Sequence, residues 1–331
     1  ISAPECFEIE KRLSEELSIP VMHDDQHGTA IISAAALLNG LELVKKKIDK
    51  VKIVVNGAGA AAISCLKLYI RLGAKRKNII VCDSKGVVTK NRKDLNKEKK
   101  KFATSRRISD LSDAMKSSDV FIGLSVGNTV SKRMLKTMKK NPLVFAMANP
   151  DPEISYEDAK SARSDVIMAT GRSDYPNQVN NVLGFPYIFR GALDVRATQI
   201  NESMKVAAVR AISSLAKENV PEEVNLAYHG KNLTFGPDYI IPKPNDPRLI
   251  TRVSTAVAKA AIKSGVAKKE ITDWDKYEDY LIEKLGLDNQ LIRSFNRIAK
   301  ENLKKVLFVE ADNYNILKSA EILKTEGLCV P

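Results

Sequence analysis

Residues 51–72 read Val51-Lys-Ile-Val-Val-Asn-Gly-Ala-Gly-Ala-Ala-Ala-Ile-Ser-Cys-Leu-Lys-Leu-Tyr-Ile-Arg-Leu72, and this stretch decides the fold. A β-branched run ends at Val55, a glycine turn follows, and the turn opens a helix with regularly spaced apolar residues. A strand, a tight turn and a helix in this order predict a unit that binds the pyrophosphate of a dinucleotide. The free N–H groups and the positive dipole end of the helix would face the phosphates.

Four small residues in and after the turn are the candidate cofactor-binding residues. Gly57 allows the tight turn, and Gly59 has no side chain to keep the backbone away from a pyrophosphate. Ala60 follows directly, and Ala62 at the third small position lets the helix pack close to the strand. The alternative is a plain strand–helix–strand unit whose glycines only make a tight turn.

An acidic residue at the end of a second strand completes the pattern. The run Ile79-Ile-Val-Cys-Asp83 places Asp83 24 residues after Gly59, a position that suits a ribose diol. Asp83 by itself favours an unphosphorylated ribose, because it would repel a 2′-phosphate. Ser84 and Lys85 offer a hydroxyl and a cation for that phosphate, and the alternative is a lysine-rich surface loop. The expected cofactor is therefore NADP, or NAD.

Two further predicted strands end in small polar residues. One runs from Ser118 into a loop that contains Ser125, and the next begins at Leu143 and carries Asn149 at its end. Because the carboxyl ends of parallel strands line the ligand crevice, Ser125 and Asn149 are expected to face the nicotinamide. An asparagine before a proline also suits a turn, which is the alternative for Asn149. The predicted fold class is α/β, with a Rossmann-like doubly wound parallel sheet and flanking helices.

Composition narrows the class of protein. The 331 residues are 44% apolar and carry a net charge of +13, which allows a large core under a basic surface. The lysine runs are interrupted by acids and lack interleaved aromatic residues, so no nucleic-acid partner is expected. We assign the charge to the attraction of anionic substrates and phosphates. No apolar run is long enough to cross a bilayer, so no membrane partner is expected.

The four cysteines lie far apart and form no Cys-x-x-Cys pair. Two of them, Cys65 and Cys82, sit inside apolar helix and strand patterns. Free buried thiols in a reducing cytoplasm are therefore expected, and zinc or a disulfide framework is not.

The most unusual local composition is His23-Asp-Asp-Gln-His-Gly-Thr-Ala30, directly before an apolar helix expected from Thr29 to about Val44. The motif holds two adjacent carboxylates, Asp24 and Asp25, and two histidines. One carboxylate could cap the helix, which is the alternative, but capping leaves the second unexplained. A hard divalent cation such as Mg²⁺ or Mn²⁺ would take an aspartate oxygen here, with further ligands from elsewhere.

A polar run near the middle of the chain, Tyr175-Pro-Asn-Gln-Val-Asn-Asn-Val182, is too polar for the core. Its paired asparagines offer neutral donors and acceptors for a carboxylate and an amide. A solvated loop is the alternative, and it is less attractive if Asn149 and Asn181 each end a strand.

The combination of the aspartate motif 23–30 with the glycine turn resembles the malic enzyme family, and the resemblance runs from about Ile1 to Val266. It implies oxidation and decarboxylation of malate to pyruvate and CO₂ with NADP or NAD and a divalent metal. It implies that Asp25 is a metal ligand and that Asp24 helps to hold the catalytic lysine. It also implies that Asn149 and Asn181 contact the substrate and the nicotinamide. The order Asp-Ser-Lys-Gly after the second strand resembles the NADP-using members.

The resemblance places the lysine base and a tyrosine acid in a domain that precedes the aspartate motif. It also places a Glu-Asp pair of metal ligands just before a sequence like that at the start of this chain. We therefore expect the 331 residues alone to bind the dinucleotide without turning over malate. The alternatives are a dinucleotide-binding module with no chemistry, or an amino-acid-type dehydrogenase that needs no metal at Asp25. A homo-oligomer, dimer or higher, is expected.

The predicted domain organisation follows the resemblance. Residues 1–28 would end an N-terminal malic domain with the metal-site loop, and 29–268 would form the NAD(P)-binding domain. A helical linker would cover 269–302. Residues 303–331 resemble the opening of a phosphotransacetylase domain, with a strand expected over Leu303–Asp312 and a helix over Ile316–Leu323.

Overall fold

The computed structural model describes residues 5–228, 232–286, 290–310 and 312–331, with only the backbone of 290–294. The chain divides into two compact units, Ile1–Trp274 and Asp275–Pro331, and each is described by itself. Over the described ranges, the structure has no helix of the length and apolarity that crossing a membrane would need.

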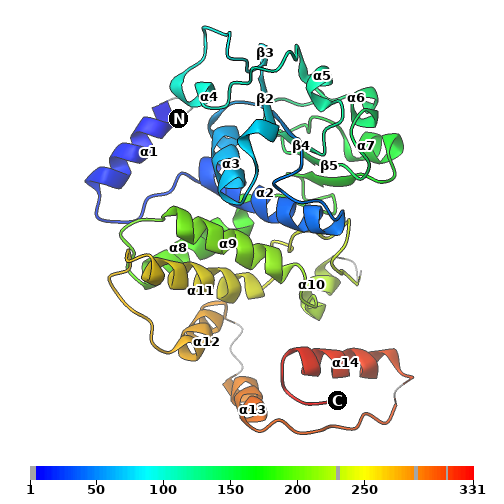
Figure 1. Ribbon diagram of the computed structural model, residues 1–331. Helices are drawn as coiled ribbons and strands as arrows, with labels where there is room; N and C mark the ends of the chain where they lie inside the picture. Colours follow the sequence, from blue (N-terminus) through cyan, green and yellow to red (C-terminus); the bar gives the residue numbers. More distant parts are fainter. Residues whose placement is uncertain (1–4, 229–231, 287–289, 311) are drawn as a thin grey trace. The chain divides into compact units, whose positions relative to one another are not determined.

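A six-stranded sheet is the centre of the first unit (Figure 1). In chain order its strands are β1 (Ile53–Asn56), β2 (Ile79–Asp83), β3 (Gly86–Val87), β4 (Val120–Gly123), β5 (Leu143–Ala146) and β6 (Ile167–Thr170). Their spatial order is β3-β2-β1-β4-β5-β6, so the winding reverses between β1 and β4. This is the doubly wound Rossmann order, and the predicted fold class is confirmed.

One edge strand departs from the predicted parallel arrangement. β3 pairs antiparallel with β2, with Asp83 opposite Gly86, whereas the other neighbouring strands pair in parallel. Only the exposed residues Ser84 and Lys85 separate the two strands. A two-residue link can make a hairpin, but a parallel neighbour needs a crossover of roughly a dozen residues. The sheet is therefore antiparallel at this edge and parallel between its other neighbouring strands.

Apolar side chains cover both faces of the sheet, as parallel strands require. On one face, alternate strand residues such as Val54 and Phe121 pack against three short helices, α5 (Leu111–Met115), α6 (Lys132–Lys136) and α7 (Tyr156–Ala162). On the other face lie α2 (Asp24–Leu43) and α3 (Ala60–Arg71) (Figure 1). A Cβ on Gly40 of α2 would lie 3.0 Å from Leu143 Cδ1, so α2 packs directly on β5.

A second helical layer packs on α2. It consists of α8 (Phe185–Asp194), α9 (Glu202–Leu215) and α11 (Arg248–Lys263), and α9 contacts both α2 and α11. A Cβ on Gly191 of α8 would lie 2.4 Å from the Ser254 carbonyl oxygen, so the absence of a side chain allows α8 to approach α11. The remaining elements of this unit are α1 (Glu5–Glu16), α4 (Lys97–Lys100), α10 (Glu222–Ala227), η1 (Arg76–Asn78) and η2 (Asn181–Leu183).

The helix of the aspartate motif begins earlier than predicted. α2 starts at Asp24 instead of Thr29, and its N-cap residue, His23, makes no side-chain capping bond. The capping explanation for Asp24 or Asp25 is therefore wrong, because both are helical residues. Their charges are still favourable there, since carboxylates in a first turn interact with the positive end of the helix dipole.

The C-terminal part of the chain is helical where helices were expected. α12 (Trp274–Lys284) starts at the last residue of the first unit, and α13 (Gln290–Glu301) and α14 (Tyr314–Thr325) follow. The strand predicted over 303–312 is absent from its described residues, where Lys305 makes a single bridge to Val330; Ala311 lies outside them. Val306 N and the Lys304 carbonyl oxygen both bond to Val330, and Leu307 and Val309 are 89% and 87% exposed.

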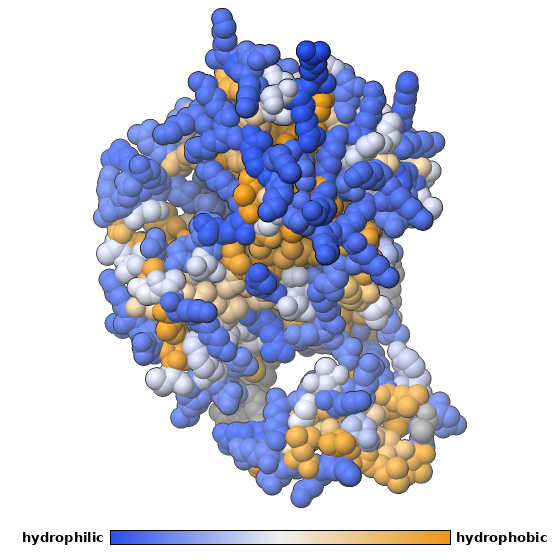
Figure 2. All heavy atoms as spheres, viewed as in Figure 1, coloured by the Kyte–Doolittle hydropathy of each residue, from blue (hydrophilic) through white to orange (hydrophobic). Residues whose placement is uncertain are grey.

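Exposed apolar side chains gather on the part of the chain that carries α14 (Figure 2). They include Leu303, Leu307, Val309, Tyr314 and Leu317. The predicted domain boundaries and the phosphotransacetylase resemblance stay predictions.

All four cysteines are buried thiols, which confirms that prediction. Burial raises the pKa of Cys65 to about 11 and the pKa of Cys82 to about 12. These two thiols are therefore protonated and unreactive at neutral pH.

Candidate functional site

The glycine turn between β1 and α3 has the predicted geometry. Gly57 lies at φ +121°, and a Cβ there would be 2.4 Å from the Leu124 carbonyl oxygen, so only glycine fits. A Cβ on Gly59 would meet nothing within 4 Å. Ala60 is the first residue of α3, and Ala62 is 1% exposed against the core. The backbone at Gly59 is therefore open to a ligand such as a pyrophosphate.

The point where the sheet order reverses is bridged by a side chain that sequence analysis missed. Asn56, the last residue of β1, donates from Nδ2 to Ser125 Oγ at 2.8 Å and to Thr129 Oγ1 at 3.1 Å. Leu124 N donates to the Asn56 carbonyl oxygen at 2.8 Å. These bonds place the Ser125 loop beside the glycine turn, at the position where doubly wound sheets bind dinucleotides.

The loops after β4 and β5 share a buried carboxylate, which sequence analysis also missed. Glu153 has no exposed surface, and its two oxygens accept hydrogen bonds from Ser125 N and Ala148 N, each at 3.1 Å. Burial raises the pKa of the Glu153 carboxyl above its ordinary value, although both N–H groups favour the charged form. A Cβ on Gly123 would lie 2.2 Å from Glu153 Cδ, so Gly123 leaves the space for this carboxylate. Glu153 thereby holds together the loops that carry Ser125 and Asn149, both of which are exposed.

Asp83 ends β2 as predicted, but cations already occupy its carboxylate. Arg92 donates from Nη1 and Nη2 to the two oxygens at 2.7 and 2.9 Å, and Lys99 Nζ donates at 3.0 Å. Arg92 also donates to Asp94, which pairs with Lys85 at 3.0 Å. Burial acts to raise the pKa of Asp83, but these partners hold it below its ordinary value. Three cations and two carboxylates therefore meet at the expected ribose position.

The start of α2 brings together two predicted site residues that are 157 positions apart. Asn181 Nδ2 donates to Asp24 Oδ2 at 3.0 Å, and Thr29 Oγ1 donates to Asn181 Oδ1 at 3.2 Å. The other Asp24 oxygen, Oδ1, is buried and has no hydrogen-bond partner in the described part of the chain. Burial raises the pKa of Asp24 and the charge of Asp25 raises it further, against the bond from Asn181. Asp24 is therefore a carboxylate that lacks one donor.

Asn181 is placed differently from the prediction. It opens the short helix η2, with Asn180 accepting from Val182 N at 3.0 Å, and it does not end a strand. β6 already ends at Thr170, and beyond it only a single bridge forms, between Thr170 and Gln178. The expectation that Asn181 ends a strand is therefore wrong, because paired asparagines bond to their own backbone and favour turns over strand pairing.

Asp25 points into solvent. Its side chain is 91% exposed, and His23 Nε2 lies 3.8 Å from its Oδ2. Among the residues that the structure describes, no group of three His, Cys, Asp or Glu side chains could hold a metal. Asp25 therefore fits as one hard oxygen ligand for a divalent cation whose other ligands come from elsewhere.

The first turn of α2 is braced by two other helices. Glu10 of α1 accepts from His23 N at 2.8 Å and from Gln26 Nε2 at 3.1 Å. Ser64 Oγ of α3 donates to Gln26 Oε1 at 3.4 Å. The helix that carries the aspartates therefore contacts the helix that opens at the glycine turn. Glu10 was also missed by sequence analysis.

Comparisons with known proteins agree with this arrangement. Residues 26–229, more than half of the chain, match the family described as "Malic enzyme, NAD binding domain". A probable NADP-dependent malic enzyme from Rickettsia prowazekii is 52% identical over 328 residues, which are 98% of this chain and 43% of that protein. An NAD-dependent malic enzyme from Rhizobium meliloti is 50% identical over 333 residues, which are 100% of this chain and 44% of that protein.

A solved structure shows the same fold. The malic enzyme from Pyrococcus horikoshii superimposes with a TM-score of 0.76 at 37% identity, over 89% of this chain and 67% of that chain. The present chain spans less than half the length of the two curated relatives named above. The family match covers α2 from Gln26 onward and the glycine turn, so the chain belongs to the malic enzyme family, of which it carries the NAD-binding domain.

Proposed function

We propose that this chain supplies the NADP-binding part, and a share of the metal and substrate site, of an enzyme that oxidises and decarboxylates malate to pyruvate and CO₂. NAD is the alternative cofactor. One observation carries the proposal: Asp24, next to the exposed Asp25, accepts a hydrogen bond from Asn181. Asp24 lies on α2, which also contacts the glycine-turn helix α3. Homo-oligomerisation and a cytoplasmic location stay predictions.

The charges around Asp83 support NADP over NAD. A ribose diol needs a free carboxylate to accept its hydroxyl protons, but both Asp83 oxygens are taken by Arg92 and Lys99. With Lys85 and Asp94 included, the cluster carries one net positive charge, which favours a 2′-phosphate. NADP-dependent and NAD-dependent relatives both lie near 50% identity, so the charges around Asp83 are the argument for NADP.

The roles of the site residues follow from their surroundings. Asp25 would hold the divalent cation, which when bound polarises substrate oxygens as a Lewis acid. The unpartnered oxygen of Asp24 would accept a hydrogen bond from a lysine ammonium and so orient the base that takes the hydroxyl proton of malate. The neutral amides of Asn149 and Asn181 would bind the malate carboxylate and the nicotinamide amide. Ser125, fixed by Asn56 and Glu153, would position the nicotinamide.

The test of the cofactor half is a fluorescence titration of the chain with NADPH and NADH. The wild type should bind NADPH more tightly. Gly59→Ala should weaken binding by about tenfold without lowering thermal stability, because the added Cβ enters space that only a ligand would fill. The matched control is Gly236→Ala, whose Cβ would make an ordinary contact 3.7 Å from the Thr234 carbonyl oxygen. Equal NADPH affinity in Gly59→Ala and wild type would refute the assignment of the turn.

A second titration separates a malate enzyme from a dinucleotide module without chemistry. Malate should tighten Mn²⁺ binding, measured by electron paramagnetic resonance on the complete enzyme that supplies the other metal ligands, with NADPH present, because metal and malate share one site. Asp25→Asn should abolish Mn²⁺ binding, and Asn181→Ala should remove only the effect of malate. If malate leaves Mn²⁺ affinity unchanged in the wild type, the module without chemistry is the correct interpretation.

A further inference from the structure

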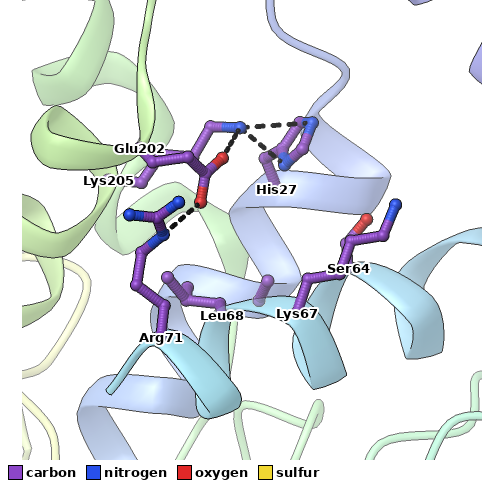
Figure 3. Close-up of a pocket in the computed structure, with 8 residues that line it drawn as sticks. His27, Ser64, Lys67, Leu68, Arg71, Glu202 and Lys205 are labelled. Atoms are coloured by element: carbon purple, nitrogen blue, oxygen red, sulfur yellow. Dashed lines mark hydrogen bonds and ion pairs between the residues drawn. The ribbon is translucent and has the colours of Figure 1, made fainter. Parts of the chain in front are cut away.

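A cavity of about 240 Å³ lies between α2, α3 and α9, lined by side chains to which the proposed function gives no role (Figure 3). Lys67 and Arg71 extend from α3, and Lys205 extends from α9. Glu202 is the one carboxylate in the lining, and Ala30 and Leu68 supply apolar wall. The lining therefore holds three cations and one acid.

The lone carboxylate of the cavity is shared by two of its cations. Lys205 Nζ donates to Glu202 Oε1 at 3.0 Å, and Arg71 Nε lies 3.3 Å from Glu202 Oε2. Figure 3 shows these contacts converging on Glu202. Lys205 also donates to His27 Nδ1 at 3.0 Å, and its side chain is only 9% exposed. Within the lining, this nearly buried ammonium pairs with one acid, which it shares with a guanidinium; outside the lining, Glu10 contacts His27 Nε2 at 3.0 Å.

Glu202 is free to leave this position. Its side chain is 43% exposed, so it can turn into water, whereas Lys205 cannot. Arg71 is 54% exposed and can reorient. Lys67 pairs at 2.8 Å with Glu98, which is not part of the lining.

The volume and chemistry of the cavity define the ligand class. About 240 Å³ holds roughly eight waters at about 30 Å³ each, which is less than a drug-sized ligand needs. An arginine fork binds a carboxylate or a phosphate through two parallel hydrogen bonds, and a lysine adds a point charge. The apolar wall strengthens such charge-assisted bonds by lowering the local dielectric.

We propose that this cavity binds a compact dianion, a phosphate or a small dicarboxylate, with Arg71 and Lys205 as its direct ligands. Glu202 occupies the anion position while the site is free and swings into solvent when the ligand enters. The site is separate from the glycine turn and from Asp25, and binding requires neither malate nor a dinucleotide.

Calorimetric titration of the full chain with inorganic phosphate, and separately with succinate, tests the proposal. Arg71→Gln should weaken binding by about tenfold, and Lys205→Met should abolish it. Glu202→Gln should tighten binding by about threefold to tenfold, because it removes the competing acid. The control, Lys50→Gln, removes one positive charge from a side chain that is 78% exposed and should change nothing.

Arg71→Gln should weaken anion binding and Glu202→Gln should strengthen it, so the test stays valid even if Lys205→Met folds poorly. Binding of only one of the two probes supports the site and identifies its ligand class. Equal affinities in Arg71→Gln, Glu202→Gln and Lys50→Gln would overturn the proposal. So would phosphate binding that is lost in Gly59→Ala and kept in Arg71→Gln, since that anion would occupy the glycine turn.

Discussion

The carboxyl edge of the sheet and the start of α2 form the two halves of the candidate site, and they are built differently. At the sheet edge, Asn56 bonds to Ser125, and both oxygens of Glu153 bond to backbone N–H groups. At the start of α2, one oxygen of Asp24 is buried without a partner in the described residues, and Asp25 is 91% exposed. The polar groups at the sheet edge are thus satisfied by their own neighbours, whereas the start of α2 carries one buried carboxylate oxygen without a partner in the described residues and one exposed carboxylate.

The difference has an energetic side. A buried polar group with its partners costs little, but a buried group left without one costs about 1–3 kcal/mol. The raised pKa of Asp24, caused by burial, marks that cost. Substitutions at the sheet edge should therefore lower the free energy of unfolding, whereas loss of the Asp24 charge should raise it.

The largest effect is expected at Gly57. Gly57→Val puts a β-branched residue at φ +121° and its Cβ 2.4 Å from a carbonyl oxygen. We expect a loss of about 3 kcal/mol in the free energy of unfolding by urea, together with loss of NADPH binding. Gly59→Ala is the comparison, with less than about 0.5 kcal/mol lost. If both variants are equally stable, the turn geometry described here is wrong.

Glu153→Gln should have the next largest effect. The amide NH₂ would face one backbone N–H, donor against donor, so Ser125 N or Ala148 N would lose its acceptor. About 2 kcal/mol of stability should be lost in urea unfolding, and NADPH affinity should fall by about tenfold because two loops shift. Glu157→Gln, an exposed carboxylate that accepts from the Tyr175 hydroxyl, is the matched control. An unchanged NADPH affinity in Glu153→Gln would show that the loops do not depend on this carboxylate.

Asp24→Asn tests the half of the site at the start of α2, where the substitution should raise the free energy of unfolding. Because the pKa of Asp24 is raised in the folded state, the folded chain binds more protons than the unfolded chain. The contribution of Asp24 to the free energy of unfolding should therefore fall as pH rises upward from the ordinary value of 3.8. Asp24→Asn should flatten this slope and gain up to about 1 kcal/mol at pH 7, measured by urea unfolding across pH. A loss of stability instead would mean that Oδ1 has a partner.

Arg92→Gln should have the smallest effect on stability and should act on cofactor choice. It frees Asp83 to repel a 2′-phosphate, so NADPH affinity should fall by about threefold to tenfold while NADH affinity holds or improves. Stability should change by less than about 1 kcal/mol, as for other partly exposed ion pairs. Arg12→Gln, in an exposed pair with Glu16, is the control. If the affinities for NADPH and NADH fall equally, Arg92 does not contribute to the choice of cofactor.

Much of the cofactor half was predictable because its signals are local. A β-branched run, two glycines and an apolar helix lie within 22 consecutive residues, and each has its own backbone requirement. The strands that precede Ser125 and Asn149 followed from the same logic, but β5 ends at Ala146 and Asn149 lies in the loop beyond it. Glu153 did not follow, because its partners are backbone N–H groups of two separate loops, and backbone groups leave no mark in a sequence.

The sequence by itself determined the strand, glycine turn and helix of residues 51–72 and placed two carboxylates side by side in the aspartate motif, because those depend on neighbours along the chain. Tertiary structure alone decided that Arg92 and Lys99 neutralise Asp83, and that Asn181 meets Asp24 across 157 positions. It also decided that Lys205 and Arg71 converge on one acid from two helices. Side chains that are distant in sequence become partners only when the packing of the core fixes which helix faces touch.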